Sequence, residues 1–125
     1  MASFETLGIR AEILRALTDL GFQEPTPVQA RTIPMLLQGQ GDVVALAQTG
    51  TGKTAAFGIP LLEAIDVEVR HVQALVLAPT RELCVQIAKD LEHFAKHLPG
   101  IKVVPVYGGA NIREQMRGIQ RGANV

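Results

Sequence analysis

The sequence of 125 residues contains few aromatic side chains and carries no net charge. Aromatic residues make up 4% of it and tryptophan is absent, which argues against an aromatic platform for stacking bases. Twelve basic residues balance twelve acidic ones, so any contact with nucleic acid has to be local. The single cysteine excludes an intrachain disulfide and an all-cysteine metal site.

Long apolar runs are also missing. The longest, such as Val43–Ala47 and Ala74–Ala78, are far shorter than the ~18–20 residues that span a bilayer. Residues 1–8 show no basic segment followed by an apolar run, so no secretory signal is visible. We therefore expect no membrane partner and a cytoplasmic location.

The hydrophobic content of 47% is typical of a chain that buries a core. Apolar, β-branched runs predict buried strands over residues 42–47, 72–78 and 101–107. Helices are predicted over residues 9–20, 27–37, 53–65, 81–98 and 111–121. Strands that alternate with helices of this length imply right-handed crossovers. The expected fold class is therefore α/β with a parallel sheet.

Residues 47–54 read Ala-Gln-Thr-Gly-Thr-Gly-Lys-Thr and match the phosphate-binding loop G-x-x-x-x-G-K-[ST] at every fixed position but the first. Gly50 and Gly52 let the backbone fold around an anion, so that N–H groups point at phosphates. Lys53 is placed to reach the β- and γ-phosphates, and the Thr54 hydroxyl to ligate Mg²⁺. An ordinary strand–helix turn would not need this Lys-Thr pair. The nucleotide site is expected to include Ala47, Gln48, Thr49, Gly50, Thr51, Gly52, Lys53 and Thr54.

Three further segments accompany this loop. Residues 21–29 read Gly-Phe-Gln-Glu-Pro-Thr-Pro-Val-Gln, with the aromatic Phe4 upstream. Residues 79–83 read Pro-Thr-Arg-Glu-Leu, and residues 107–109 read Tyr-Gly-Gly. In their order and spacing, the four segments resemble the Q motif, the phosphate loop, motif Ia and the GG motif of the DEAD-box RNA helicases of superfamily 2. Cys84 stands where that family usually has alanine.

The resemblance implies a RecA-like, P-loop fold that binds ATP and Mg²⁺. Within the family, Gln29 reads adenine and Phe22 packs against the ring, and we place Phe4 and Thr26 in the same site. A side-chain amide offers one donor and one acceptor, which suits adenine and mismatches guanine. Thr26-x-x-Gln29 is also the spacing of a capping box, in which Gln29 folds back on the start of a helix.

RNA is the second ligand that the resemblance implies. Pro79, Thr80, Arg81 and the backbone of Gly108 and Gly109 would contact the sugar–phosphate chain, which carries no sequence information. A simpler interpretation makes Thr80 an N-cap, although an arginine in a first helical turn opposes the helix dipole. Glycines after a strand are also common for reasons of turn geometry.

By resemblance, residues 1–125 are the N-terminal portion of the first RecA-like domain, with the Asp-Glu-Ala-Asp motif expected after Val125. We expect binding of adenine nucleotide without turnover. The expected partners are RNA, the remainder of the helicase core and further copies of this chain, which would pair through open strand edges. A P-loop kinase or GTPase would not explain Gln29, Phe4 or residues 79–83. A non-catalytic RNA- or protein-binding module remains the alternative.

Two other patterns are given structural interpretations. His93 and His97 lie one helical turn apart, but without a third ligand they are interpreted as a solvated helix face. Ile112, Met116 and Ile119 are expected to form the apolar face of the last helix.

Overall fold

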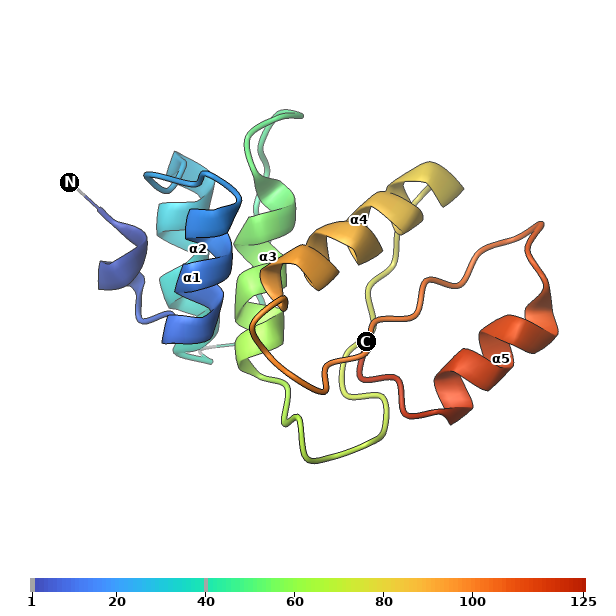
Figure 1. Cartoon of the computed structure of the whole chain (residues 1–125). Coiled ribbons are helices and arrows are strands. Elements are labelled where there is room, and N and C mark those ends of the chain that lie inside the picture. Colours follow the sequence, from blue (N-terminus) through green and yellow to red (C-terminus); the bar gives the residue numbers. More distant parts are fainter. Residues whose placement is uncertain (1, 40) are drawn as a thin grey trace.

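A computed structural model describes residues 2–39 and 41–125 of the chain. Over these residues the helices are, in chain order, the 3-10 helix η1 (Phe4–Leu7), α1 (Ala11–Asp19), α2 (Pro27–Leu37), α3 (Lys53–Glu63), α4 (Arg81–Phe94) and α5 (Ile112–Gln120). Figure 1 shows α1, α2 and α3 grouped together with α4 packed on α3, while α5 stands apart from them. No helix in the described parts of the chain is long and apolar enough to cross a membrane.

The five predicted α-helices are confirmed, most with shorter ends than predicted, and η1 was not predicted. Local capping explains where several of them begin. The Thr26 hydroxyl accepts from the Gln29 backbone N–H, and Pro27 takes the first helical position of α2. The Thr80 hydroxyl likewise accepts from the Leu83 N–H at 3.2 Å and starts α4.

The core lies between α1, α2, α3 and α4. Its largest fully buried apolar side chains are Ile13, Leu17, Ile33, Ile59, Leu62 and Leu91. Gly58 allows α4 to approach α3 closely, because a Cβ at this position would lie 2.8 Å from the Leu91 Cδ2. The start of α1 is fixed to the end of α3, since Glu63 accepts from the Arg10 backbone N–H at 2.7 Å and pairs with its guanidinium at 3.2 Å. The helix of the phosphate-binding loop is thus held on both sides.

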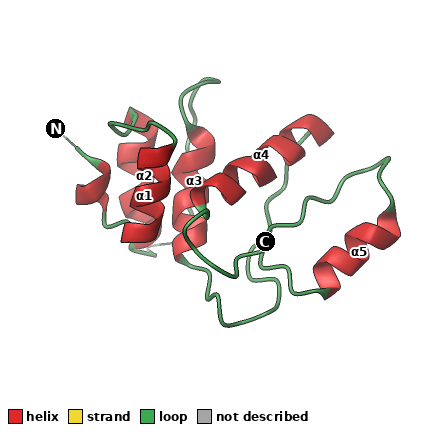
Figure 2. Ribbon diagram, viewed as in Figure 1, coloured by secondary structure: helices red, strands yellow, loops and turns green. Residues whose placement is uncertain are grey.

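The predicted parallel sheet is not confirmed. Residues 42–47, 72–78 and 101–107 run without regular structure, and the described residues contain no β-strand (Figure 2). A strand exists only as part of a hydrogen-bonded ladder with a neighbour, and an apolar sequence cannot supply that neighbour by itself. Alternate side chains in the first two segments are exposed, with Leu46 at 94% and Leu77 at 84%. These segments therefore have strand-like sequences but no ladder along their length.

Residues near the C-terminus join the beginnings of two of these segments. The Asn124 carbonyl accepts from the N–H groups of Gln73 and Ala74, and the Val125 carbonyl accepts from Val104. The Asn124 side chain is 1% exposed and bonds the Lys102 N–H at 2.9 Å. A buried asparagine of this kind gives no periodic signal, and the sequence did not predict its role.

Helix α5 differs from the others because none of its residues is buried. Ile112 is 69% exposed and Met116 is 52% exposed. The apolar face expected on this helix is present, but it faces solvent in the structure.

Candidate nucleotide and RNA site

The phosphate-binding loop bends back on itself before α3. Gly50 and Gly52 adopt φ angles of +76° and +81°, a region that side chains other than glycine rarely enter. Gly52 is the N-cap of α3, so the first N–H groups of that helix open toward the loop. The Lys53 ammonium donates to the Ala47 carbonyl at 2.7 Å, and the Thr51 hydroxyl donates to the Gln48 carbonyl at 2.6 Å. The two ends of the predicted loop are thereby brought together.

The segment that resembles the Q motif contacts this loop directly. The Thr26 hydroxyl donates to the Thr51 carbonyl at 2.8 Å, and the Gln29 Nε2 donates to the Gly52 carbonyl at 3.1 Å. The approach is so close that a Cβ on Gly52 would collide with the Gln29 amide. Glycine is therefore needed at 52 for two independent reasons, its φ angle and this contact.

The capping-box interpretation of Gln29 is confirmed. The Gln29 Oε1 accepts from the Thr26 backbone N–H at 3.0 Å, and the Gln29 backbone N–H donates to the Thr26 hydroxyl at 3.4 Å. The orientation of the side-chain amide follows from its two partners: Oε1 has to accept from the Thr26 N–H, and Nε2 has to donate to the Gly52 carbonyl. Within the described residues, one side-chain N–H of Gln29 and one lone pair of its Oε1 are not used in a hydrogen bond and are left for a ligand.

A cavity of about 450 Å³ lies where the two motifs meet. Its lining residues are Gly21, Phe22, Gln23, Glu24, Thr26, Gln29, Gly50 and Gly52. We call it the Q-motif cavity. The Phe22 ring lies between two other rings, with centroid distances of 6.0 Å to both Phe4 and Phe94. Phe4 is 3% exposed and is not among the residues that line the cavity, so it supports Phe22 from behind.

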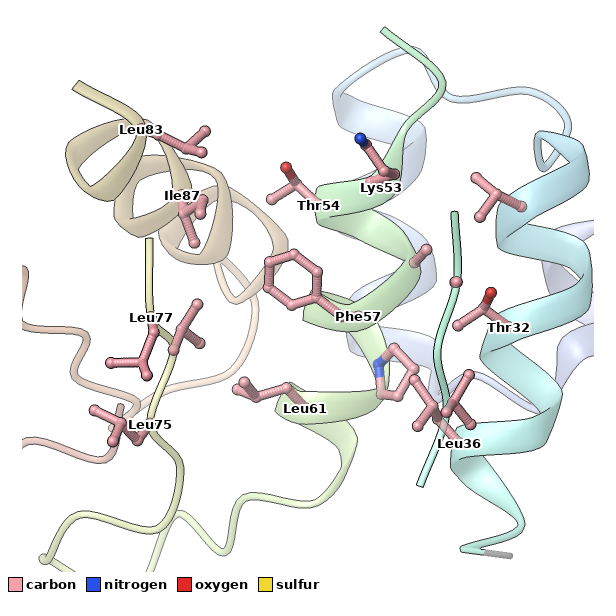
Figure 3. A pocket seen from close by; sticks show the side chains of 16 residues that line it. Thr32, Leu36, Lys53, Thr54, Phe57, Leu61, Leu75, Leu77, Leu83 and Ile87 are labelled. Carbon is pink, nitrogen blue, oxygen red and sulfur yellow. The ribbon is translucent and has the colours of Figure 1, made fainter. Parts of the chain in front are cut away.

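A larger cavity of about 730 Å³ lies alongside α3 (Figure 3). Lys53 and Thr54 lie at one end of it, and apolar side chains such as Phe57, Leu61 and Leu77 line the rest. Apart from the residues of the phosphate loop, this cavity offers few polar groups to a ligand. The Q-motif cavity, although smaller, has the better chemistry for a nucleobase.

Thr54 is the residue predicted to ligate Mg²⁺. The described residues contain no group of three or more His, Cys, Asp or Glu side chains close enough to hold a metal ion. A single hydroxyl in the first turn of α3 fits Mg²⁺, because this ion keeps several waters and takes most of its other ligands from phosphates.

The residues predicted to contact RNA are brought together at the start of α4. The Arg81 Nη1 donates to the Gly108 carbonyl at 3.1 Å, across 27 positions of sequence. Gly109 has a φ of +85°, and a Cβ there would lie 2.7 Å from the Arg81 Nη1. Thr80 caps α4, as the simpler interpretation predicted, and Pro79 precedes it. All five residues are exposed.

One cluster was missed from the sequence. Asp19, at the end of α1, lies 2.7 Å from the His97 Nε2 and 3.2 Å from the Lys96 Nζ. Hydrogen bonds from His97 first, and then from Lys96, hold the pKa of the Asp19 carboxyl below its usual value. His93 is exposed on α4, as expected, whereas His97 lies beyond the end of that helix, is half-buried and pairs with Asp19. Positions 19 and 97 share no local pattern that would have revealed the contact.

The family model for DEAD/DEAH box helicases matches residues 26–125. The ATP-dependent RNA helicase DeaD of Klebsiella pneumoniae is 54% identical over the whole chain, and that of Mycobacterium tuberculosis (strain H37Rv) is 50% identical over 99% of it. This chain spans 20% and 22% of the length of these two relatives.

Two solved structures have the same arrangement of the chain. A DEAD box protein from Methanococcus jannaschii matches 98% of this chain with a TM-score of 0.91 and 38% identity, over 33% of its own length. The RNA helicase Prp28 from Chaetomium thermophilum, bound to ADP, matches 98% with a TM-score of 0.88 and 41% identity, over 31% of its length. The family model covers most of the sequence. The chain belongs to the DEAD/DEAH box helicase family.

Proposed function

We propose that this chain binds ATP, with the phosphates at residues 47–54 and the adenine in the Q-motif cavity. One observation carries the proposal: Gln29 bonds the Thr26 N–H and the Gly52 carbonyl at the same time. Its amide is therefore held at the wall of a cavity that also contains the glycines of the phosphate loop. A base at Gln29 and phosphates at Lys53 would belong to one nucleotide.

Adenine is the base that matches the remaining hydrogen-bonding groups of Gln29. The amide retains one donor and one acceptor, and the edge of adenine presents the N7 acceptor and the N6 amino donor. Guanine presents two acceptors, N7 and O6, at the same edge, so the Gln29 carbonyl would face another oxygen. Phe22 lines the same cavity and supplies an aromatic surface for the base.

The phosphates would be bound by the start of α3. The unpaired N–H groups of its first turn favour an anion, and the Lys53 ammonium adds a mobile positive charge. Lys53 is exposed, and it has two further N–H donors besides the one bonded to Ala47. Mg²⁺ would neutralise phosphate charge, with Thr54 as its ligand from this chain. The structure of Prp28, which is 41% identical over the matched part, is of a protein bound to ADP, and this supports a nucleotide ligand for the present chain.

We further propose that the protein to which this chain belongs is an ATP-dependent RNA helicase, as the names of its relatives state for them. Pro79, Thr80, Arg81, Gly108 and Gly109 would form its contact with the RNA backbone. Arg81 supports this, because its exposed guanidinium keeps further donors for phosphate after bonding Gly108. Such contacts would not distinguish one RNA sequence from another.

Competition binding tests the proposal. Fluorescently labelled ATP is bound to the whole 125-residue chain and displaced by unlabelled ATP, GTP or tripolyphosphate, all with Mg²⁺. We expect ATP to displace the label at the lowest concentration, because only ATP satisfies both Gln29 and the loop. Equal displacement by ATP and GTP would contradict the adenine assignment. No binding of the label would favour a module that uses this fold without nucleotide.

A further inference from the structure

The end of α1 is connected to the segment after α4 through the Asp19 cluster, which consists of Asp19, Lys96 and His97. The Asp19 Oδ2 lies 2.7 Å from the His97 Nε2 and 3.2 Å from the Lys96 Nζ. Residues 19 and 97 are 78 positions apart. The cluster therefore links two elements whose relative position local sequence does not determine.

The position of Asp19 in its own helix is unfavourable. It is the last residue of α1, where the carbonyl ends of the helix already carry partial negative charge. The Lys96 ammonium and the His97 imidazole, both from the segment after α4, offset that repulsion. Since the Asp19 and Lys96 side chains are 44% and 62% exposed, these pairs contribute little to overall stability. We therefore consider which part of the chain these pairs hold in position.

The chain that leaves α1 carries Phe22 on a rigid turn. The Gly21 N–H bonds the Thr18 carbonyl at 3.0 Å, and the Phe22 N–H bonds the Leu17 carbonyl at 2.9 Å. This is a Schellman motif, and Gly21 takes the left-handed conformation that it requires, with φ +80°. The backbone of Phe22 is thereby fixed relative to the helical turn that ends at Asp19.

The Phe22 side chain meets α4 as well. Its ring packs edge-on against Phe94, the last residue of α4, at a centroid distance of 6.0 Å and an interplanar angle of 75°. Phe94 precedes His97 by three residues, so the ring contact and the Asp19 cluster are adjacent along the chain. The end of α4 thus holds the Phe22 turn at two points, one ionic and one aromatic.

We propose that Asp19 is a positioning residue for the base: by pairing with His97 and Lys96, it holds the Phe22 ring at the wall of the Q-motif cavity. This inference rests on the proposed function, because Phe22 matters only if that cavity receives a base. Asp19 itself does not line the cavity. Its influence on a ligand would pass through the Schellman turn and the ring.

Asp19→Asn tests this assignment, since it removes the charge and keeps the size of the side chain. Glu92→Gln is the matched control: it removes the same charge from an exposed position of α4 that makes no ion pair among the described residues. Dissociation constants for ATP and for tripolyphosphate are measured with both variants. We expect Asp19→Asn to raise the dissociation constant for ATP by about threefold to tenfold and to leave that for tripolyphosphate unchanged. Combining Asp19→His with His97→Asp restores the pair and should restore ATP binding.

The aromatic resonances of Phe22 provide a readout that needs no nucleotide. The chain has four phenylalanines, so selective labelling resolves each ring by NMR. Because Phe22 lies against two other rings, its resonances should move in Asp19→Asn and return in the exchanged pair. If the unsubstituted chain does not prefer ATP to GTP, the proposed function fails, and the Phe22 resonances alone decide the role of Asp19.

Two results would overturn the inference. Unmoved Phe22 resonances in Asp19→Asn would show that the ring does not depend on the cluster. An equal loss of ATP and tripolyphosphate would show a general disturbance of the site and not a positioning of the base.

Discussion

Gln29 and Gly52 are joined by a hydrogen bond of 3.1 Å from the side-chain amide to the backbone carbonyl. The bond connects α2 to the N-cap of α3, and therefore the segment that resembles the Q motif to the phosphate-binding loop. Because Gln29 is 2% exposed, the contact belongs to the packed interior and not to a mobile surface. The groups expected to recognise the base and those expected to bind the phosphates are accordingly neighbouring parts of one site.

Replacing Gln29 with alanine removes both bonds of the amide. We expect Gln29→Ala to erase the difference between ATP and GTP affinity, because no group remains to distinguish the bases. The free energy of unfolding should fall by about 1–3 kcal/mol, since the Thr26 N–H and the Gly52 carbonyl lose their partner. Gln38→Ala, at an exposed position that follows the same helix, is the control and should change neither value. A Gln29→Ala chain that still prefers ATP would contradict the role assigned to this residue.

Lys53→Ala separates phosphate binding from base binding. Lys53 is exposed and bonds only the Ala47 carbonyl, so the fold should tolerate its loss. We expect ATP to weaken by about 10- to 100-fold, the range for a charge-assisted contact worth ~1.5–3 kcal/mol, with adenosine hardly affected. Calorimetric titration of both ligands measures the ratio, with the exposed Lys89→Ala as control. Similar losses for ATP and adenosine would mean that Lys53 does not contact phosphate.

Gly52→Ala should lower the free energy of unfolding more than Gly39→Ala does, although both glycines have a positive φ. Gly39 also has a positive φ, +66°, but a Cβ there would meet nothing within 4 Å. Gly39→Ala therefore measures the strain of the backbone alone, about 1–2 kcal/mol. At position 52 the Cβ also displaces the Gln29 amide, so we expect a larger loss of stability and weaker ATP binding. Equal losses of unfolding free energy in urea titrations of the two variants would argue against the close contact.

The sequence predicted the helices and the backbone geometry of the glycine-rich loop, because both depend on local chemistry. Thr26 and Thr80 cap the helices that follow them, and the glycines at 50 and 52 have the backbone angles that the loop needs. The sheet could not be predicted in this way. Residues 42–47 have the composition of a strand, but a strand also requires a neighbouring backbone, which depends on distant parts of a chain.

Contacts between side chains that lie far apart in the sequence could not be predicted from it either. Asp19 and His97 lie on elements whose packing is decided by the core, so no spacing in the sequence signals their pairing. The resemblance placed Phe4 in the nucleotide site, but its burial against Phe22 was visible only in three dimensions.

Acid should remove the contribution of the Asp19 cluster to stability. His97 and Lys96 hold the pKa of the Asp19 carboxyl below its usual value, which is about 3.9 in an unfolded chain. A carboxyl with a lowered pKa in the folded state stabilises the fold above the unfolded pKa, and this stabilisation is lost as the pH falls through the folded pKa. The difference in Tm between the unsubstituted chain and Asp19→Asn should therefore be small but constant near pH 5–6 and should shrink below about pH 4. A difference that persists to about pH 2 would contradict this linkage.

The exposed extended segments should cause self-association. Leu46 and Leu77 are 94% and 84% exposed, and the backbones that carry them form no ladder among the described residues. Unpaired apolar edges of this kind bind other chains. Light scattering after size exclusion should give an apparent mass that rises with concentration, and Leu46→Lys with Leu77→Lys should reduce the rise. Met35→Lys, on the surface of α2, is the control. A constant monomer mass across the dilution series would refute the expectation.

The central claim is that one nucleotide contacts Gln29 and the phosphate-binding loop at the same time. NMR titration of the ¹⁵N-labelled chain tests it most directly, because the Gln29 side-chain NH₂ and the backbone amides of Gly50 and Gly52 report on the two halves of the site. We predict that ATP shifts all of these resonances together, with the same apparent dissociation constant. GTP and tripolyphosphate should shift the loop amides and leave the Gln29 NH₂ in place. Loop shifts with ATP that leave the Gln29 NH₂ unmoved, or a Gln29 shift as large with GTP as with ATP, would contradict the claim.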